Sequence, residues 1–171
     1  MSAAADFDFL RGRWTIVHRR LRNRGAGSND WMQFEGSAEN RPLLSGAANV
    51  EEHVIPGEDF GGIALRTFSP VDDLWSIYWV SHSDGLLGPP VRGRFSADLG
   101  IFEGQDQDGS IAVMVRFLWR RIDPMRAQWT QYFSYDGGEH WEKNWIMDFR
   151  RMEDARRSRP RVRVPGPAPA G

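Results

Sequence analysis

Histidine is the side chain in this sequence with the widest range of chemistry, since it can bind metals and transfer protons near neutral pH. The chain has four: His18, His53, His82 and His140. None of them belongs to an H-x-H, H-x-x-x-H or H-E-x-x-H pattern, so the short metal motifs of cupins and zincins are absent and we predict no metal site. His82 and His140 lie among turn residues, where we expect both to be exposed.

His18 lies in a run of alternating character and shares parity with Trp14 and Ile16. Side chains two residues apart on a strand point to the same face, so His18 faces inward if Trp14 does. An inward histidine is either a hydrogen-bonded core residue or a polar group of a pocket, because buried polar atoms need partners. Both interpretations remain open from the sequence, and His18 is one of our candidate binding residues.

Aromatic residues are the other notable feature, with eight tryptophans in 171 residues. They either fill a core or line an aromatic pocket. A ligand pocket usually combines apolar walls with a few polar groups. On parity we therefore predict that a pocket is lined by three tryptophans and two polar side chains: Trp79, Trp129, Trp145, Gln131 and Arg66.

Arg66 or Arg116 would suit a carboxylate or phenolate because the guanidinium is a planar fork of donors. Glu35 could instead pair with one of these arginines as a structural ion pair. The sequence favours the ion pair.

Signatures of catalysis are missing. The chain has no G-x-S-x-G, no G-x-G-x-x-G and no Walker sequence, so nucleophilic hydrolases and nucleotide cofactors are not predicted. A cofactor-independent enzyme remains as an alternative, a cyclase, isomerase or hydrolase of bacterial small-molecule metabolism. It would use His18 with Arg66, Glu35 or Gln131.

Composition restricts the class of protein. The length suits one domain, and the net charge of −1 gives no reason to expect nucleic acid or an acidic membrane as partner. The absence of cysteine excludes disulfides and thiolate chemistry. We find neither a secretory signal nor an apolar run of about 20 residues, so we expect a soluble cytoplasmic protein.

The remaining pattern is one of strands. Apolar residues alternate with polar ones, and Gly, Pro, Asn and Asp separate the runs, which indicates an all-β barrel with up-and-down order. Only 6–11 has a helical pattern. We predict about ten strands, at 13–23, 31–38, 47–55, 62–68, 74–80, 91–96, 101–105, 111–120, 128–135 and 141–150. The barrel domain is predicted over 1–150, followed by a basic, Pro/Ala/Gly-rich disordered tail over 151–171.

Gly12-Arg13-Trp14 resembles the G-x-W element of lipocalins, in which the tryptophan closes one end of the barrel. That resemblance implies that a late arginine, Arg150 or Arg151, packs on the indole. The stretches 7–14, 75–79 and 133–145 resemble a bacterial family of uncharacterised calycin-like proteins. The resemblance implies a calycin-like barrel, often a homodimer, and no agreed activity. By analogy with nitrobindin-type barrels, His18 as a haem ligand is a minor alternative; otherwise we predict no cofactor.

Residues 134–141 resemble the Asp-box of sialidases, but the box occurs once in a chain too short for a propeller. We therefore interpret it as a hairpin stabiliser, in which Asp136 accepts backbone N–H groups.

Taken together, the sequence predicts that a small apolar or aromatic molecule binds in the barrel lumen, without identifying that molecule. The hypothesis requires a cavity of a few hundred Å³. A dimerisation module with exposed tryptophans is a further alternative.

Overall fold

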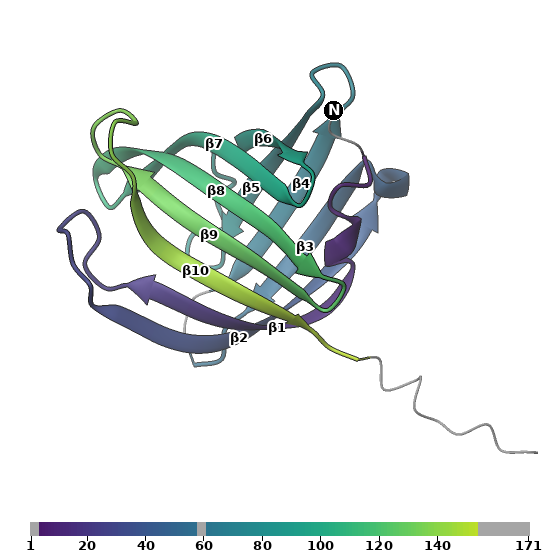
Figure 1. The fold of residues 1–171 in the computed structure, drawn as a ribbon, viewed down its shortest axis with the longest axis horizontal. Helices are drawn as coiled ribbons and strands as arrows, with labels where there is room; N and C mark the ends of the chain where they lie inside the picture. Colours follow the sequence, from purple (N-terminus) through teal and green to yellow (C-terminus); the bar gives the residue numbers. More distant parts are fainter. Residues whose placement is uncertain (1–3, 58–60, 154–171) are drawn as a thin grey trace, which may run out of the picture.

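A computed structural model describes residues 4–57 and 61–153, and in it ten antiparallel strands form one closed barrel (Figure 1). The expected all-β, up-and-down architecture is confirmed, and all ten predicted strands are present. Among the described residues, no helix is long and apolar enough to span a membrane. The strands are β1 (Gly12–Leu21), β2 (Trp31–Leu43), β3 (Ala48–Val54), β4 (Gly62–Ser69), β5 (Leu74–Ser81), β6 (Val91–Ser96), β7 (Leu99–Asp108), β8 (Ile111–Asp123), β9 (Arg126–Ser134) and β10 (Glu142–Arg151).

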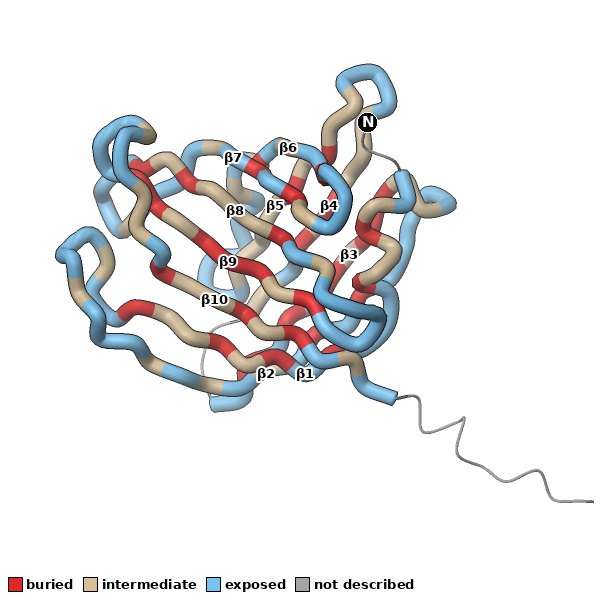
Figure 2. Tube along the Cα trace, viewed as in Figure 1, coloured by how far each residue is buried: buried red, intermediate tan, exposed pale blue. Residues whose placement is uncertain are grey.

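Pairing follows the order of the chain. Each strand pairs with the strand before it and the strand after it, and β1 closes the ring by pairing with both β2 and β10. Burial alternates along the strands, with inward residues buried and their neighbours more exposed (Figure 2). Because side chains alternate with a period of two, one of every two successive side chains lies inside the barrel.

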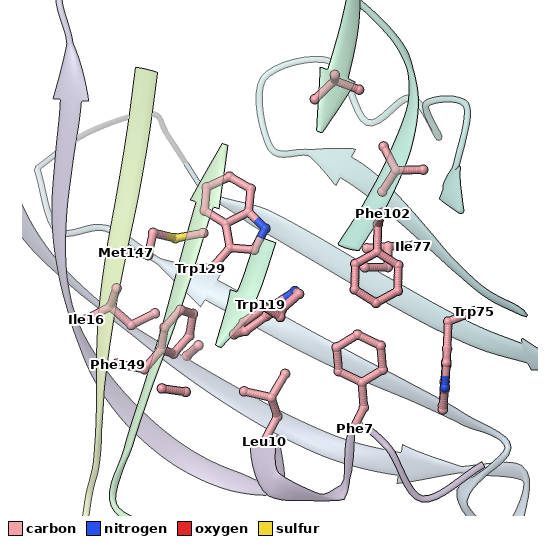
Figure 3. Packing of buried hydrophobic residues seen from close by; sticks show 14 of the residues in the cluster. Phe7, Leu10, Ile16, Trp75, Ile77, Phe102, Trp119, Trp129, Met147 and Phe149 are labelled. Carbon is pink, nitrogen blue, oxygen red and sulfur yellow. The ribbon is translucent and has the colours of Figure 1, made fainter. Parts of the chain in front are cut away.

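The N-terminal segment closes one end of the barrel. In place of the short helix predicted over 6–11, it forms a single 3₁₀ turn, η1 (Asp8–Leu10). A segment this short cannot nucleate a stable α-helix, so its place is set by the side chains it buries. Phe7 and Leu10 are buried and point from this segment toward Trp119 (Figure 3).

Aromatic rings fill this end of the lumen. Phe7 meets Trp75, Phe95 and Trp119 edge-on, at centroid distances of 4.9, 5.1 and 6.1 Å. Edge-to-face contacts of this kind stabilise a core beyond their buried area. We call the set the closed-end plug: Phe7, Leu10, Trp14, Trp75, Phe95, Phe102, Trp119 and Phe149.

Trp14 joins the plug to the N-terminal segment. Its indole Nε1 donates to the carbonyl oxygen of Leu10 at 2.7 Å. The guanidinium of Arg151 lies 4.2 Å from the Trp14 ring centroid and donates to the carbonyl oxygens of Phe9, Arg11 and Pro124. The G-x-W expectation is thus confirmed, and the arginine is Arg151.

The C-terminal strand differs from its predicted pattern. The alternation predicted for 141–150 is wrong before Trp145, because the β9–β10 register shifts between Lys143 and Trp145. Asn144 is buried at this bulge while Lys143 is exposed. Arg151 is the last residue of β10, and 154–171, most of the predicted tail, lies outside the described residues.

We expect Arg151→Ala to lower the free energy of unfolding by about 2 kcal/mol, because it removes charged hydrogen bonds and the contact with Trp14. The neighbouring exposed residue gives a matched control, and Arg150→Ala should change stability by less than about 0.5 kcal/mol. Urea unfolding of both variants measures the difference. Equal losses would show that Arg151 does not hold the closed end.

Candidate functional site

Beyond the plug, the lumen is open. A cavity of about 960 Å³ extends from Trp119 to residues at the opposite strand ends, such as Ser81, Asp108 and Ser134. Its walls include the rings of Trp79, Trp119, Trp129, Trp145, Phe117 and Phe133. The cavity exceeds the few hundred Å³ that the ligand hypothesis requires.

All six candidate residues from the sequence line this one cavity. They come from five strands: His18 on β1, Arg66 on β4, Trp79 on β5, Trp129 and Gln131 on β9, and Trp145 on β10. Inward parity on a closed barrel brings them together, since every inward side chain points at the same lumen. Their role in binding a ligand stays a prediction.

His18 is held in the neutral form in the wall. The imidazole is 1% exposed, stacks on Phe34 at 4.7 Å, and accepts a hydrogen bond from Trp145 Nε1 to its Nδ1 at 3.3 Å. Burial lowers the pKa of His18 to about 3, with nearby His53 and Arg20 acting in the same direction. A side chain at Gly36 would meet His18 Nε2 at 2.9 Å, so this glycine makes room for the ring.

Gln131 is fixed by the bulge on the neighbouring strand. Its Nε2 donates to Asn144 Oδ1 at 2.9 Å, and both residues are buried. Sequence reasoning missed Asn144, because simple alternation places it on the outer face. Its inward position depends on the register shift after Lys143.

Arg66 belongs to a buried group of charged and polar side chains. Its Nη2 donates to Glu51 Oε1 at 2.8 Å and its Nη1 to Asn49 Oδ1 at 3.0 Å. The same Glu51 oxygen lies 2.7 Å from His53 Nε2. We call Asn49, Glu51, His53 and Arg66 the Glu51 cluster.

Glu51 is 0% exposed and yet ionised. Burial alone would raise its pKa, but the charge and hydrogen bond of Arg66, together with His53, outweigh burial and lower the pKa below the usual range. An unpaired charge at this depth would be strongly destabilising, so the arginine and the carboxylate require each other.

The predicted alternative, an ion pair of Glu35 with Arg66 or Arg116, is wrong. Glu35 is exposed, and Arg66 pairs with Glu51. Arg116 points outward, where it pairs with Glu103 at 2.6 Å and covers the ring of Trp141. The available signal for Glu51 was its parity with Asn49 and His53, three polar residues on one face of a strand.

Polar side chains surround the open end. Asp108 accepts from Arg24 at 2.5 Å and from the Tyr135 hydroxyl at 2.7 Å. Burial and the hydrogen bond to Asp108 raise the pKa of Tyr135, so the phenol keeps its proton. This network ties the segment after β1 to the hairpins that carry Asp108 and Tyr135.

The Asp-box-like hairpin has the structural role we expected. Asp136 accepts the backbone N–H of His140 at 2.9 Å and the Ser134 hydroxyl at 2.8 Å. Asp136, Glu139 and His140 bring ligand atoms within 4.8 Å of one another, but all three are exposed. Exposed acidic groups of this kind commonly hold no metal.

No protein-family model and no curated protein matches the chain. Among solved structures, a redesigned β-barrel, b11L5F_LGL, is 13% identical with a TM-score of 0.49, covering 90% of this chain and 100% of that chain. The structure of EF1p2_mFAP2b bound to DFHBI is 12% identical with a TM-score of 0.45, covering 88% of this chain and 100% of that chain. Neither likeness assigns a family or bears on function.

The lowered pKa of His18 predicts acid sensitivity. An unfolded histidine binds a proton below about pH 6.5, whereas folded His18 does so only near pH 3, so acidification through this range favours unfolding. Between about pH 6 and about pH 5, the wild type should lose about 1 kcal/mol more stability than His18→Asn. Asn keeps an acceptor for Trp145 but cannot be protonated.

Urea unfolding at both pH values measures this difference. Glu51 is present in both proteins, so its contribution to the pH dependence is common to them and cancels in the comparison. Parallel losses in the wild type and in His18→Asn would contradict a neutral, buried His18.

Proposed function

We propose that the barrel binds a small apolar or aromatic molecule in its lumen. One observation carries the proposal, a cavity of about 960 Å³ walled by tryptophan and phenylalanine rings. Pockets for small molecules are typically concave, largely apolar and of this size. A protein core, by contrast, is packed without voids much larger than a water molecule.

The arrangement of rings supports a flat ligand. Trp129 meets Trp145 edge-on at 5.7 Å and Phe117 edge-on at 4.8 Å, so several ring faces and edges border the same space. A planar aromatic molecule can stack on one of these rings while meeting the edge of another.

Polar groups in the wall would fix the orientation of such a ligand. Gln131 and His18 are held by hydrogen bonds to Asn144 and Trp145 respectively, so their positions are set before a ligand arrives. Pre-organised groups lose little entropy on binding. Both supporting residues lie on β10, which pairs with β9 on one side and with β1 on the other.

Filling part of the cavity should weaken binding. Ala64 is an inward residue of β4 that lines the cavity, and its neighbour Ile63 is exposed on the outer face. Ala64→Phe should reduce the affinity for 2-naphthol at least about tenfold by occupying the ligand's space, whereas Ile63→Phe should leave it unchanged. Quenching of tryptophan fluorescence gives the affinities.

Two results would contradict the proposal. One is the absence of saturable quenching of the wild type by 2-naphthol, indole and 4-nitrophenol alike. The other is an equal loss of affinity in Ala64→Phe and Ile63→Phe, which would place the binding site outside the lumen.

A further inference from the structure

Binding of an apolar ligand does not by itself explain why the cavity wall contains the buried carboxylate and histidine of the Glu51 cluster. The cluster lies in the cavity wall, where Glu51, His53 and Arg66 all line the space. Small residues face it across the neighbouring strands, since Glu51 pairs with Ala64, and His53 pairs with Gly62 and Ala38. Arg66 packs over the rings of Phe7 and Trp119, while His53, which is 7% exposed, is the member of the cluster with the most surface left open.

The hydrogen bonds of the cluster fix which nitrogen of His53 carries the proton. An ionised carboxylate only accepts hydrogen bonds, so His53 Nε2 donates to Glu51 Oε1 at 2.7 Å. When the imidazole is neutral, Nδ1 then carries a lone pair. That nitrogen forms no hydrogen bond to any residue within 4–57 or 61–153.

Packing holds the His53 ring in place. Trp79 meets it edge-on at a centroid distance of 5.5 Å, and Phe149 meets it edge-on at 6.3 Å. A histidine in a cavity wall that is oriented by a buried carboxylate through one nitrogen, with the other nitrogen not hydrogen-bonded, has the arrangement of a general base.

His18, the candidate favoured by the sequence, fits this role less well. Its Nδ1 already accepts a hydrogen bond from Trp145. His53 has the carboxylate partner that His18 lacks among the described residues.

We propose that His53 is a general base that removes a proton from a planar aromatic molecule bound in the cavity, with Glu51 as its positioning residue. The proposal rests on the proposed function, because the molecule must first occupy the cavity. It implies an isomerisation or elimination that needs no cofactor. The Arg66 guanidinium holds Glu51 in its ionised form.

The proposed step transfers one proton from the ligand to His53 and leaves one electron pair on the ligand. A C–H, N–H or O–H proton of the ligand passes to His53 Nδ1, and the imidazolium is stabilised through Nε2 by the Glu51 carboxylate. The electron pair left on the ligand moves into its π-system or breaks a bond to a leaving atom. The proton then returns to another atom of the ligand or to water, which restores neutral His53.

A suitable probe is 5-nitrobenzisoxazole, which is flat and reacts by loss of one proton. When a base takes the C3 proton, the C–H electrons form the nitrile, the N–O bond breaks, and the oxygen leaves as a coloured phenolate. We expect kcat/KM of the wild type to exceed the rate constant of free imidazole at least about 100-fold. His53→Ala should lose about 100-fold, and added imidazole should restore part of the rate.

Glu51→Gln tests the positioning role. It should lower kcat about tenfold or more while leaving KM unchanged, because Gln cannot stabilise the imidazolium as a carboxylate does. Circular dichroism shows whether this variant folds, and the imidazole rescue of His53→Ala keeps the proposal testable if it does not.

The exposed pair of His140 and Asp136 is a matched control. Its Nδ1–Oδ2 distance is also 2.7 Å, but His140 is largely exposed to solvent and does not line the cavity. His140→Ala should keep the wild-type rate.

A wild type no faster than imidazole, or a His53→Ala variant with the wild-type rate, would overturn the proposal. Quenching by 2-naphthol, indole and 4-nitrophenol in the same samples distinguishes the general base from the proposed function. Binding without turnover refutes only the general base, whereas the absence of both refutes the proposed function as well.

Discussion

Closure of the sheet by the β1–β10 pairing sets the width of the lumen, and the rest of the structure depends on that width. Eight strands leave an interior that side chains from the wall just fill, and ten strands leave more. The wall cannot fill this volume alone. At one end, Phe7 and Leu10 supply the missing atoms from the N-terminal segment. At the other end no comparable segment of the described residues enters, and the unfilled volume is the cavity.

The two ends of the lumen consequently differ in chemistry. The closed-end plug is almost wholly apolar, and arginines secure it from outside, with Arg151 on Trp14 and Arg121 on Phe95. The cavity wall instead carries Glu51 and Arg66, two charges that are both buried. Replacing a buried ion pair by apolar residues often costs no stability, so folding alone does not call for the pair, and the role proposed for it is in the site.

Much of this architecture could be predicted from the sequence, because alternation reports directly on the two faces of a strand. The G-x-W element indicated that Trp14 points inward, and side chains two and four residues later should then do the same. His18 is indeed buried on the inner face. Alternation does not report on register or on bulges. The Glu51–Arg66 pair depends on how β3 pairs with β4, and the inward position of Asn144 depends on the shift in β10. Neither the strand pairing nor the register shift produces a pattern in the local sequence.

The most direct test of the central claim, that a flat aromatic molecule enters the lumen, is anomalous diffraction from crystals soaked with 6-bromo-2-naphthol. Bromine marks the position of the ligand independently of any assumption about its contacts. We expect one dominant bromine peak inside the cavity, next to Trp79, Trp129 or Trp145. Bromine peaks found only on the outer wall, or a lumen closed by side chains where the cavity should lie, would contradict it.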